Sequence, residues 1–112
     1  MTIYQTLKNR VLAFGQDATT YATRGTLIFK SARVFAEMYE AGKGTKLVFR
    51  VRPEGFQIAE KASEIVHGVL VKRVPDSYGW SVNHVFEVTG TTDLDAVEKI
   101  LRQSYNGANR KS

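Results

Sequence analysis

The chain has 112 residues, of which 43% are hydrophobic and 24% charged, with no cysteine and a formal net charge of +5. We expect one globular domain over residues 1–107 and a disordered tail over 108–112, and the missing cysteines exclude disulfides, thiol catalysis and cysteine-ligated zinc. No apolar run reaches the roughly 20 residues that cross a bilayer, and the N-terminus lacks a signal-peptide core, so we expect a soluble cytoplasmic protein without membrane contact.

The first predicted element is a helix over residues 3–14. Thr2 and Gln5 have the spacing of a capping box, and Gly15 stands where a left-handed residue ends a helix. The apolar residues of this segment recur at helical spacing and form one stripe: Ile3, Tyr4, Leu7, Val11 and Phe14. We therefore expect this helix to pack on one side only.

Short runs rich in β-branched and aromatic residues follow the helix. They predict strands at 19–23, 26–30, 33–39 and 46–52, with turns at Arg24-Gly25 and at 42–44. Within the third run, Phe35 and Tyr39 share a face with Glu37, so both rings are predicted to point outward.

The second half is predicted to contain one more helix, two strands and the C-terminal helix. The segment 56–66 has apolar residues at helical spacing, and 69–74 is a short strand. Residues 78–90 alternate as one long strand, with Trp80, Val82, His84, Phe86 and Val88 on one face. The last helix begins at Thr91 or Thr92 and ends near Tyr105.

This order of elements predicts an α+β fold. The N- and C-terminal helices each have one apolar stripe, so both are expected on one face of an antiparallel sheet of about five to six strands. The result is a two-layer sandwich whose other sheet face is open to solvent.

Positive charge is concentrated in the first half of the chain. Residues 1–52 have a charge balance of +6 and residues 53–112 a balance of −1. A focused positive surface favours an anionic partner, either nucleic acid or an acidic protein, although a solvated basic face gives the same pattern. The predicted contact residues are Arg24, Lys30, Arg33, Lys46, Arg50 and Arg52.

Motifs of catalysis are missing from the sequence. It has no nucleophile elbow, no phosphate-binding loop and no metal-ligand spacing, and its two histidines, His67 and His84, lie in separate predicted elements. We therefore predict a binding domain rather than an enzyme, with no cofactor and no metal. A histidine on the apolar face of a strand, such as His84, must find a hydrogen-bond partner when it is buried.

Two other functions remain open from the sequence. The first is a small-ligand pocket between sheet and helices, lined by Tyr21, Phe35, Trp80 and His84. The second is a homodimeric accessory protein that associates through a sheet edge or through the surface of Phe35 and Tyr39.

Several segments together resemble an uncharacterised bacterial domain-of-unknown-function family. They are 29–30, 33–37, 46–49, Gly79-Trp80 with 86–88, and the helix that contains 93–95 and 100–105. Members occur alone or at the C-terminus of predicted transport or restriction-related proteins. The family is similar in outline to the MmcQ and YjbR type of double-wing, frataxin-like domain, some of which are regarded as DNA-binding. The chain departs from the family pattern at 56–66 and 77–78.

Overall fold

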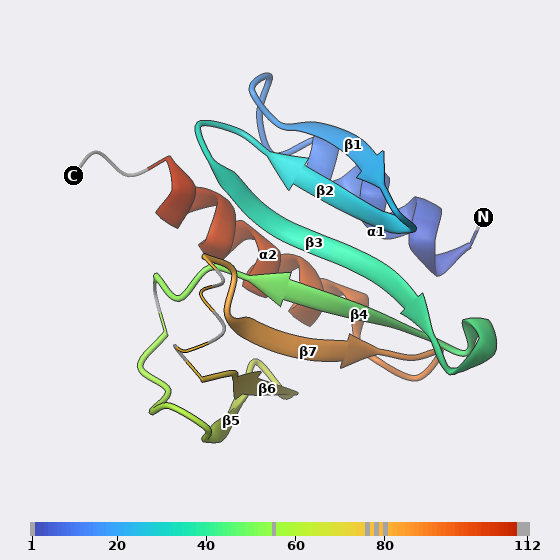
Figure 1. The fold of residues 1–112 in the computed structure, drawn as a ribbon. Coiled ribbons are helices and arrows are strands. Elements are labelled where there is room, and N and C mark those ends of the chain that lie inside the picture. Colours follow the sequence, from blue (N-terminus) through green and yellow to red (C-terminus); the bar gives the residue numbers. More distant parts are fainter. Residues whose placement is uncertain (1, 55, 76, 78, 80, 110–112) are drawn as a thin grey trace.

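The computed structural model describes residues 2–54, 56–75, 77, 79 and 81–109, and it has two helices and a single antiparallel sheet (Figure 1). The elements are α1 Ile3–Leu12, β1 Thr19–Thr23, β2 Thr26–Lys30, β3 Val34–Ala41, the 3₁₀ turn Gly42–Gly44, β4 Lys46–Val51, β5 Ser63–Val66, β6 Val69–Arg73, β7 His84–Val88 and α2 Leu94–Ala108. The sheet has seven strands in the order β1-β2-β3-β4-β7-β6-β5. The predicted α+β class is confirmed, but the predicted five to six strands are too few.

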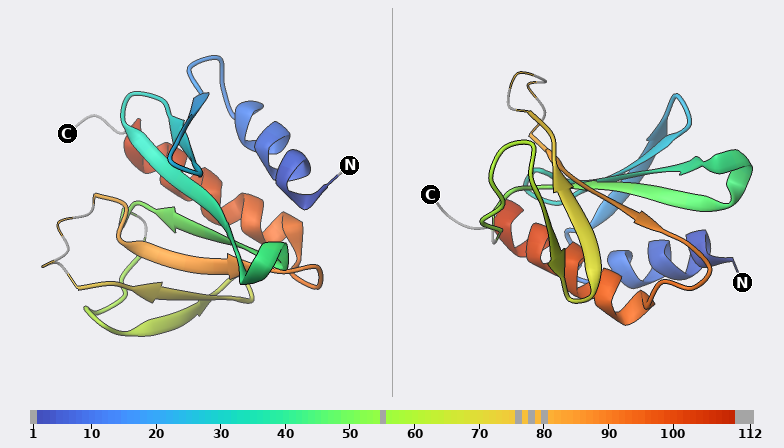
Figure 2. Two further views of the ribbon diagram at one scale, coloured as in Figure 1. Left: turned by 45° about the vertical axis from the view of Figure 1, so that its right-hand side comes forward. Right: turned by 90° about the horizontal axis from the view of Figure 1, so that it is seen from below.

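Both helices lie on the same side of β3 and β4, as the right-hand view of Figure 2 shows. Arg10 of α1 connects them, because its Nη1 atom lies 2.8 Å from Asp95 Oδ1 and 3.5 Å from Glu98 Oε1 of α2. At the start of α1, Thr2 and Gln5 form the predicted capping box. In the part of the chain that the structure describes, neither helix is long and apolar enough to span a membrane.

The core lies between the sheet and the helices. One cross-strand row on this side contains the neighbours Leu27, Met38, Phe49 and Phe86, and the rings of Phe49 and Phe86 stack with centroids 5.2 Å apart. These residues belong to one buried cluster with Leu7 and Val11 of α1 and with the apolar face of α2. Burial of these large side chains on the face that packs against the helices fixes the register of the strands, since a shift of one residue would turn them to the other face.

The helix predicted at residues 56–66 is wrong. The last four described residues of that segment, Ser63–Val66, form β5 and pair with β6 across the two-residue turn His67-Gly68. His67 and Gly68 have φ values of 53° and 85°, which suit the two central positions of a type I′ hairpin turn. The local hairpin therefore overrides the helical spacing of the alanines, and it adds the strand that the prediction missed.

The strand predicted over residues 78–90 is longer than the strand in the structure. Strand β7 begins at His84 and ends at Val88, and Trp80 lies outside the described residues. Asp93 caps α2, since its side chain accepts a hydrogen bond of 2.9 Å from Asp95 N. This helix extends past Tyr105 to the buried Ala108, which the prediction had assigned to the disordered tail.

Candidate functional site

The face of the sheet that points away from the helices carries a second cross-strand row. Its members are neighbours in register, one from each of six strands: Tyr21, Ile28, Glu37, Arg50, Val85 and Lys72. We call this side of the sheet the open face. The row runs from an aromatic ring at the β1 edge, through an ion pair at the centre, to a lysine on β6.

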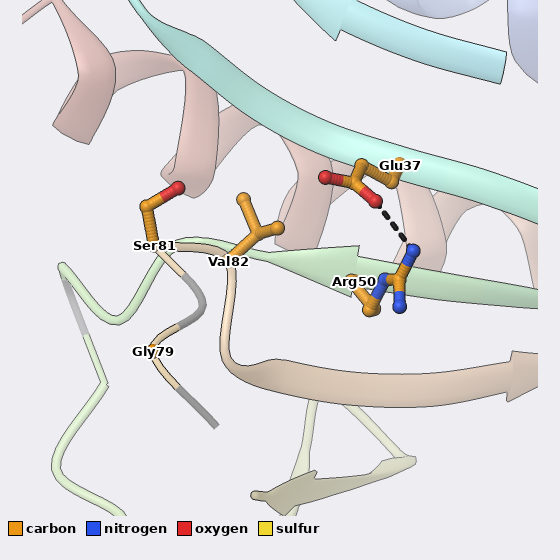
Figure 3. A pocket seen from close by; sticks show the side chains of 5 residues that line it. All are labelled: Glu37, Arg50, Gly79, Ser81 and Val82. Atoms are coloured by element: carbon orange, nitrogen blue, oxygen red, sulfur yellow. Dashed lines mark hydrogen bonds and ion pairs between the residues drawn. The ribbon is translucent and has the colours of Figure 1, made fainter. Parts of the chain in front are cut away.

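Glu37 and Arg50 form the central ion pair of the open face (Figure 3). Arg50 Nη2 donates to Glu37 Oε1 over 2.5 Å, and each side chain is 20% exposed. The guanidinium carbon of Arg50 also lies 5.6 Å from the centre of the Tyr39 ring, which is a cation–π distance. The pair is therefore mostly sheltered from water, with about a fifth of each side chain exposed to a ligand.

A shallow pocket of about 280 Å³ opens beside this ion pair, lined by Glu37, Arg50, Gly79, Ser81 and Val82. Ser81 and Val82 belong to the segment that leads into β7, as Figure 3 shows. Val82 is buried and supplies an apolar wall, whereas Ser81 is exposed. The pocket therefore combines one carboxylate, one guanidinium and one hydroxyl group on a mostly polar floor.

Three of the six predicted basic contact residues form hydrogen bonds or ion pairs within the chain that stabilise the fold. Arg52 binds Glu54 through Nη2 at 2.8 Å and Val34 O through Nη1 at 3.2 Å. Arg33 donates to Ala108 O and Gly107 O, each over 3.1 Å, at the C-terminus of α2. Lys46 pairs with Glu87 on the open face at 2.9 Å.

The other three predicted basic residues are also dispersed. Arg50 occupies the pocket described above, whereas Arg24 lies in the β1–β2 turn and Lys30 at the opposite end of β2. Both Arg24 and Lys30 are exposed, and no acid of the described chain lies within ion-pair distance of either. The structure therefore does not gather the six residues into one basic patch.

The four residues predicted to line a ligand pocket are not brought together either. Phe35 and His84 are buried in the layer between sheet and helices, at 0% and 2% exposure, while Tyr21 is on the open face at 50% exposure. Trp80 lies outside the described residues. The pocket that the structure does contain is on the opposite side of the sheet from Phe35 and His84.

The orientation of Phe35 corrects the prediction that its ring points outward. Phe29 pairs with Ala36 and Lys30 with Val34, so Phe35 is the extra residue of a β-bulge in β3. The bulge turns the ring toward α2, where it meets Tyr105 edge-on with centroids 5.3 Å apart. Simple alternation cannot reveal such an insertion, because a bulge shifts the face of every residue before it.

His84 is a buried histidine whose one hydrogen-bond partner among the described residues is the adjacent Asn83. Its Nδ1 atom lies 2.7 Å from Asn83 Oδ1, and Nε2 has no hydrogen-bond partner among the described residues. Burial and then the nearby charge of Arg73 lower the pKa of His84 to about 4, against a smaller opposing effect of Glu54. The described residues contain no group of three or more His, Asp or Glu side chains able to hold a metal ion.

Four pocket residues were not identified from the sequence: Glu37, Gly79, Ser81 and Val82. The alternation of β3 already placed Glu37 outward, and pairing of the two strands across the 42–44 turn sets it opposite Arg50. Ser81 and Val82 gave no such signal, because they were assigned to a regular strand that in fact begins at His84.

Comparison with known proteins places this architecture in a family. A family model described as "Domain of unknown function (DUF5655)" matches residues 1–108. No curated protein and no solved structure matches the chain. The resemblance to an uncharacterised domain family is thereby confirmed. Because the match spans α1 to the end of α2, the chain belongs to the family of the domain of unknown function DUF5655.

Proposed function

We propose that this domain is a non-enzymatic binding module for single-stranded nucleic acid and that its binding surface is the open face. The observation that carries the proposal is the central arrangement of Arg50, whose guanidinium lies over the Tyr39 ring and beside a pocket of about 280 Å³. Cations interleaved with aromatic rings on an exposed sheet bind the phosphates and stack on the bases of single strands.

Charge on and around the open face supports an anionic ligand. Lys72 stands in the same cross-strand row as Arg50, separated from it by Val85, and is exposed. The whole chain carries a net charge of +5, which attracts a polyanion from a distance. Lys72 is therefore the residue of this row best placed for a phosphate contact.

The shape of the surface favours a single strand over a duplex. The major groove of B-form DNA is about 12 Å wide and admits a helix or a two-stranded ribbon. The open face belongs to a sheet of seven strands and is too broad to enter such a groove. Unpaired bases, by contrast, can lie flat on a broad sheet.

The pocket gives one base a polar contact. Glu37 Oε1 accepts from Arg50, and the same carboxylate can accept further hydrogen bonds from the amino or imino group of a base. The hydroxyl of Ser81 can donate or accept, and Val82 forms an apolar wall. A base with adjacent donor and acceptor groups on its edge would satisfy both sides of this pocket.

Fluorescence anisotropy with labelled single-stranded DNA and RNA over a series of salt concentrations tests the proposal. Binding is expected at low salt, and Lys72→Gln should weaken it and lower the magnitude of the salt slope by about 0.7, the value of one phosphate contact on a single strand. Lys99→Gln removes the same charge from the exposed side of α2 and should leave binding unchanged. Absence of binding at low salt would refute the proposal, as would equal losses in the two variants.

The pocket itself favours a second candidate function, the binding of a small polar ligand. Its volume of about 280 Å³ is at the lower end for ligand sites, and its carboxylate and guanidinium could hold a zwitterionic or amide-bearing molecule without any contact to the rest of the face. NMR titration with free nucleosides and amino acids distinguishes the two. Shifts confined to Glu37, Arg50, Ser81 and Val82, with no affinity for oligonucleotides, would favour the small ligand.

A further inference from the structure

Strand β1 forms an edge of the sheet and has none of the usual protection of edge strands. Its sequence, Thr-Thr-Tyr-Ala-Thr, contains no charge and no proline, and four of its five residues are exposed. Natural edge strands are commonly blunted by lysines, prolines or bulges, because their unpaired backbone groups recruit other strands. The opposite edge, β5, is shorter, carries Glu64 and follows Lys61, whose φ of 63° bends the chain.

The turn at the end of β1 determines which backbone groups point away from the sheet. Arg24 and Gly25 have φ values of 47° and 81°, as in a two-residue type I′ turn, so Thr23 and Thr26 are its hydrogen-bonded closing pair. Hydrogen-bonded and non-bonded pairs alternate along an antiparallel ladder. Tyr21 therefore directs its N–H and C=O groups to β2, and Thr20 and Ala22 direct theirs outward.

We propose that two copies of this chain associate through β1, in antiparallel register about a two-fold axis at Tyr21, so that their sheets become continuous. In this register Thr20 of each copy lies opposite Ala22 of the other. All four outward-pointing residues then form two hydrogen-bonded pairs that flank the axis, and the Tyr21 side chains of the two copies face each other.

Charge complementarity at the two ends of β1 favours a second copy as the occupant. Asp17 lies just before the strand and Arg24 just after it. The Asp17 carboxylate accepts hydrogen bonds from Tyr105 Oη and Asn109 Nδ2 of its own chain, but neither donor is a cation, so its negative charge is still available to attract an arginine. Antiparallel pairing about Tyr21 places Ala18 opposite Arg24 of the second copy, so that Asp17 comes next to that arginine at both ends of the interface. Among the described residues no acid of the same chain forms an ion pair with Arg24. A parallel arrangement would instead bring like charges together.

The Tyr21 ring gives the interface its apolar contact. It is 50% exposed on the open face, although it is one of the largest side chains of the chain. Residues directly opposite in a non-hydrogen-bonded pair have Cβ atoms about 4.5–5.5 Å apart, which allows the two rings to pack. The interface involves only one strand from each copy, so we expect a weak dimer whose population rises with protein concentration.

Sedimentation velocity over a wide range of concentrations, combined with amide hydrogen exchange, tests the proposal. The amides of Thr20 and Ala22 should become protected as the concentration rises, whereas the amide of Tyr21 should be protected at every concentration because it bonds to β2. A monomer at all concentrations would overturn the proposal. Protection that spreads along β5 instead of β1 would overturn it as well.

Two variants and a matched control test whether β1 is the strand through which the two copies associate. Tyr21→Lys places two like charges at the axis and should abolish association, while Ile65→Lys makes the same change at the 66% exposed Ile65 of β5 and should leave it intact. Ala22→Pro removes an outward N–H, which an edge strand tolerates, and should also give a monomer. A circular dichroism spectrum must first show that each variant is folded. If the folded Tyr21→Lys and Ala22→Pro variants both still form dimers, the proposal is contradicted.

Discussion

The imidazole of His84 stacks on the ring of Phe56, with centroids 5.1 Å apart and an angle of 30° between the planes. Its Nδ1 atom bonds to Asn83 Oδ1, so the proton of the neutral ring resides on Nδ1 and is donated to the amide oxygen. The ring is 2% exposed, and its surroundings disfavour the charged form. His84 thus contributes to the core as a neutral, stacked ring.

The pKa of His84 predicts that the fold loses stability in mild acid. The pKa is about 4 in the folded protein and near its ordinary value of 6.5 in the unfolded chain, so the unfolded chain binds more protons between these values. The neutral, buried imidazole makes its full contribution to the free energy of unfolding above pH 6.5, and this contribution is lost as the pH falls from 6.5 to 4. The free energies of unfolding measured in urea at pH 7 and pH 4 should therefore differ by on the order of 3 kcal/mol because of this group.

A variant of His84 separates this effect from general acid denaturation. His84→Leu should flatten the dependence of the unfolding free energy on pH between 6.5 and 4.5. Burial opposes the charged form of Glu54, but the Arg52 contact lowers its pKa below the ordinary 4.5, so the stability that Glu54 contributes is present at neutral pH and is lost only as the pH falls below about 4.5. An unaltered slope in His84→Leu would rule out the buried imidazole as the source.

Local signals in the sequence were sufficient for much of the fold. The Thr2 capping box, the Arg24-Gly25 turn and the alternation within β4 are short-range patterns, and the structure contains each of them. The His67-Gly68 turn carries a comparable signal, but the helical spacing of the alanines before it predicts a helix instead. The backbone pairing of β5 with β6 in the hairpin decides between the two local patterns, and the spacing of apolar residues does not reveal this pairing.

The candidate site was harder to predict because strand pairing decides which residues lie next to one another in it. Arg50 was identified by its charge, but its neighbours on the open face depend on the register with β3 and on the path of the segment before β7. Arg33 and Arg52 have the same charge and a similar place in the sequence, yet they bind a helix end and Glu54. Composition alone does not distinguish a basic residue that supports the fold from one that is available to a ligand.

The close approach of α2 to the side chain of Glu54, in the segment after β4, predicts that a side chain at position 107 destabilises the fold. A Cβ atom at position 107 would lie 2.7 Å from the Cβ atom of Glu54, which holds Arg52. Gly107→Ala should lower the free energy of unfolding by about 1–3 kcal/mol through overpacking. Gly90→Ala is the matched control, since nothing lies within 4 Å of its Cβ position, and urea unfolding should show a change of at most a few tenths of a kcal/mol.

The buried hydroxyl of Ser104 joins α2 to the two central strands. It donates to Phe35 O at the β-bulge and accepts a bond of 2.9 Å from Arg52 N, and the residue is 0% exposed. Ser104→Ala leaves both backbone groups without this partner and should cost about 1–3 kcal/mol in urea unfolding. Ser63→Ala, on the exposed face of β5, should be near neutral. Equal stability of the two variants would mean that water replaces the Ser104 hydroxyl at no cost.

Arg33 and Arg24 should behave differently when each is truncated, although both belong to the predicted contact set. Arg33 donates to the last carbonyls of α2, where a positive charge also meets the negative end of the helix dipole. Arg33→Ala should therefore lower the free energy of unfolding by about 1 kcal/mol and increase amide exchange in the last turn of α2. Arg24→Ala should leave the stability of the monomer unchanged, because the side chain extends from an exposed turn. If Arg24→Ala destabilised the monomer as much as Arg33→Ala, the distinction between supporting and available basic residues would fail.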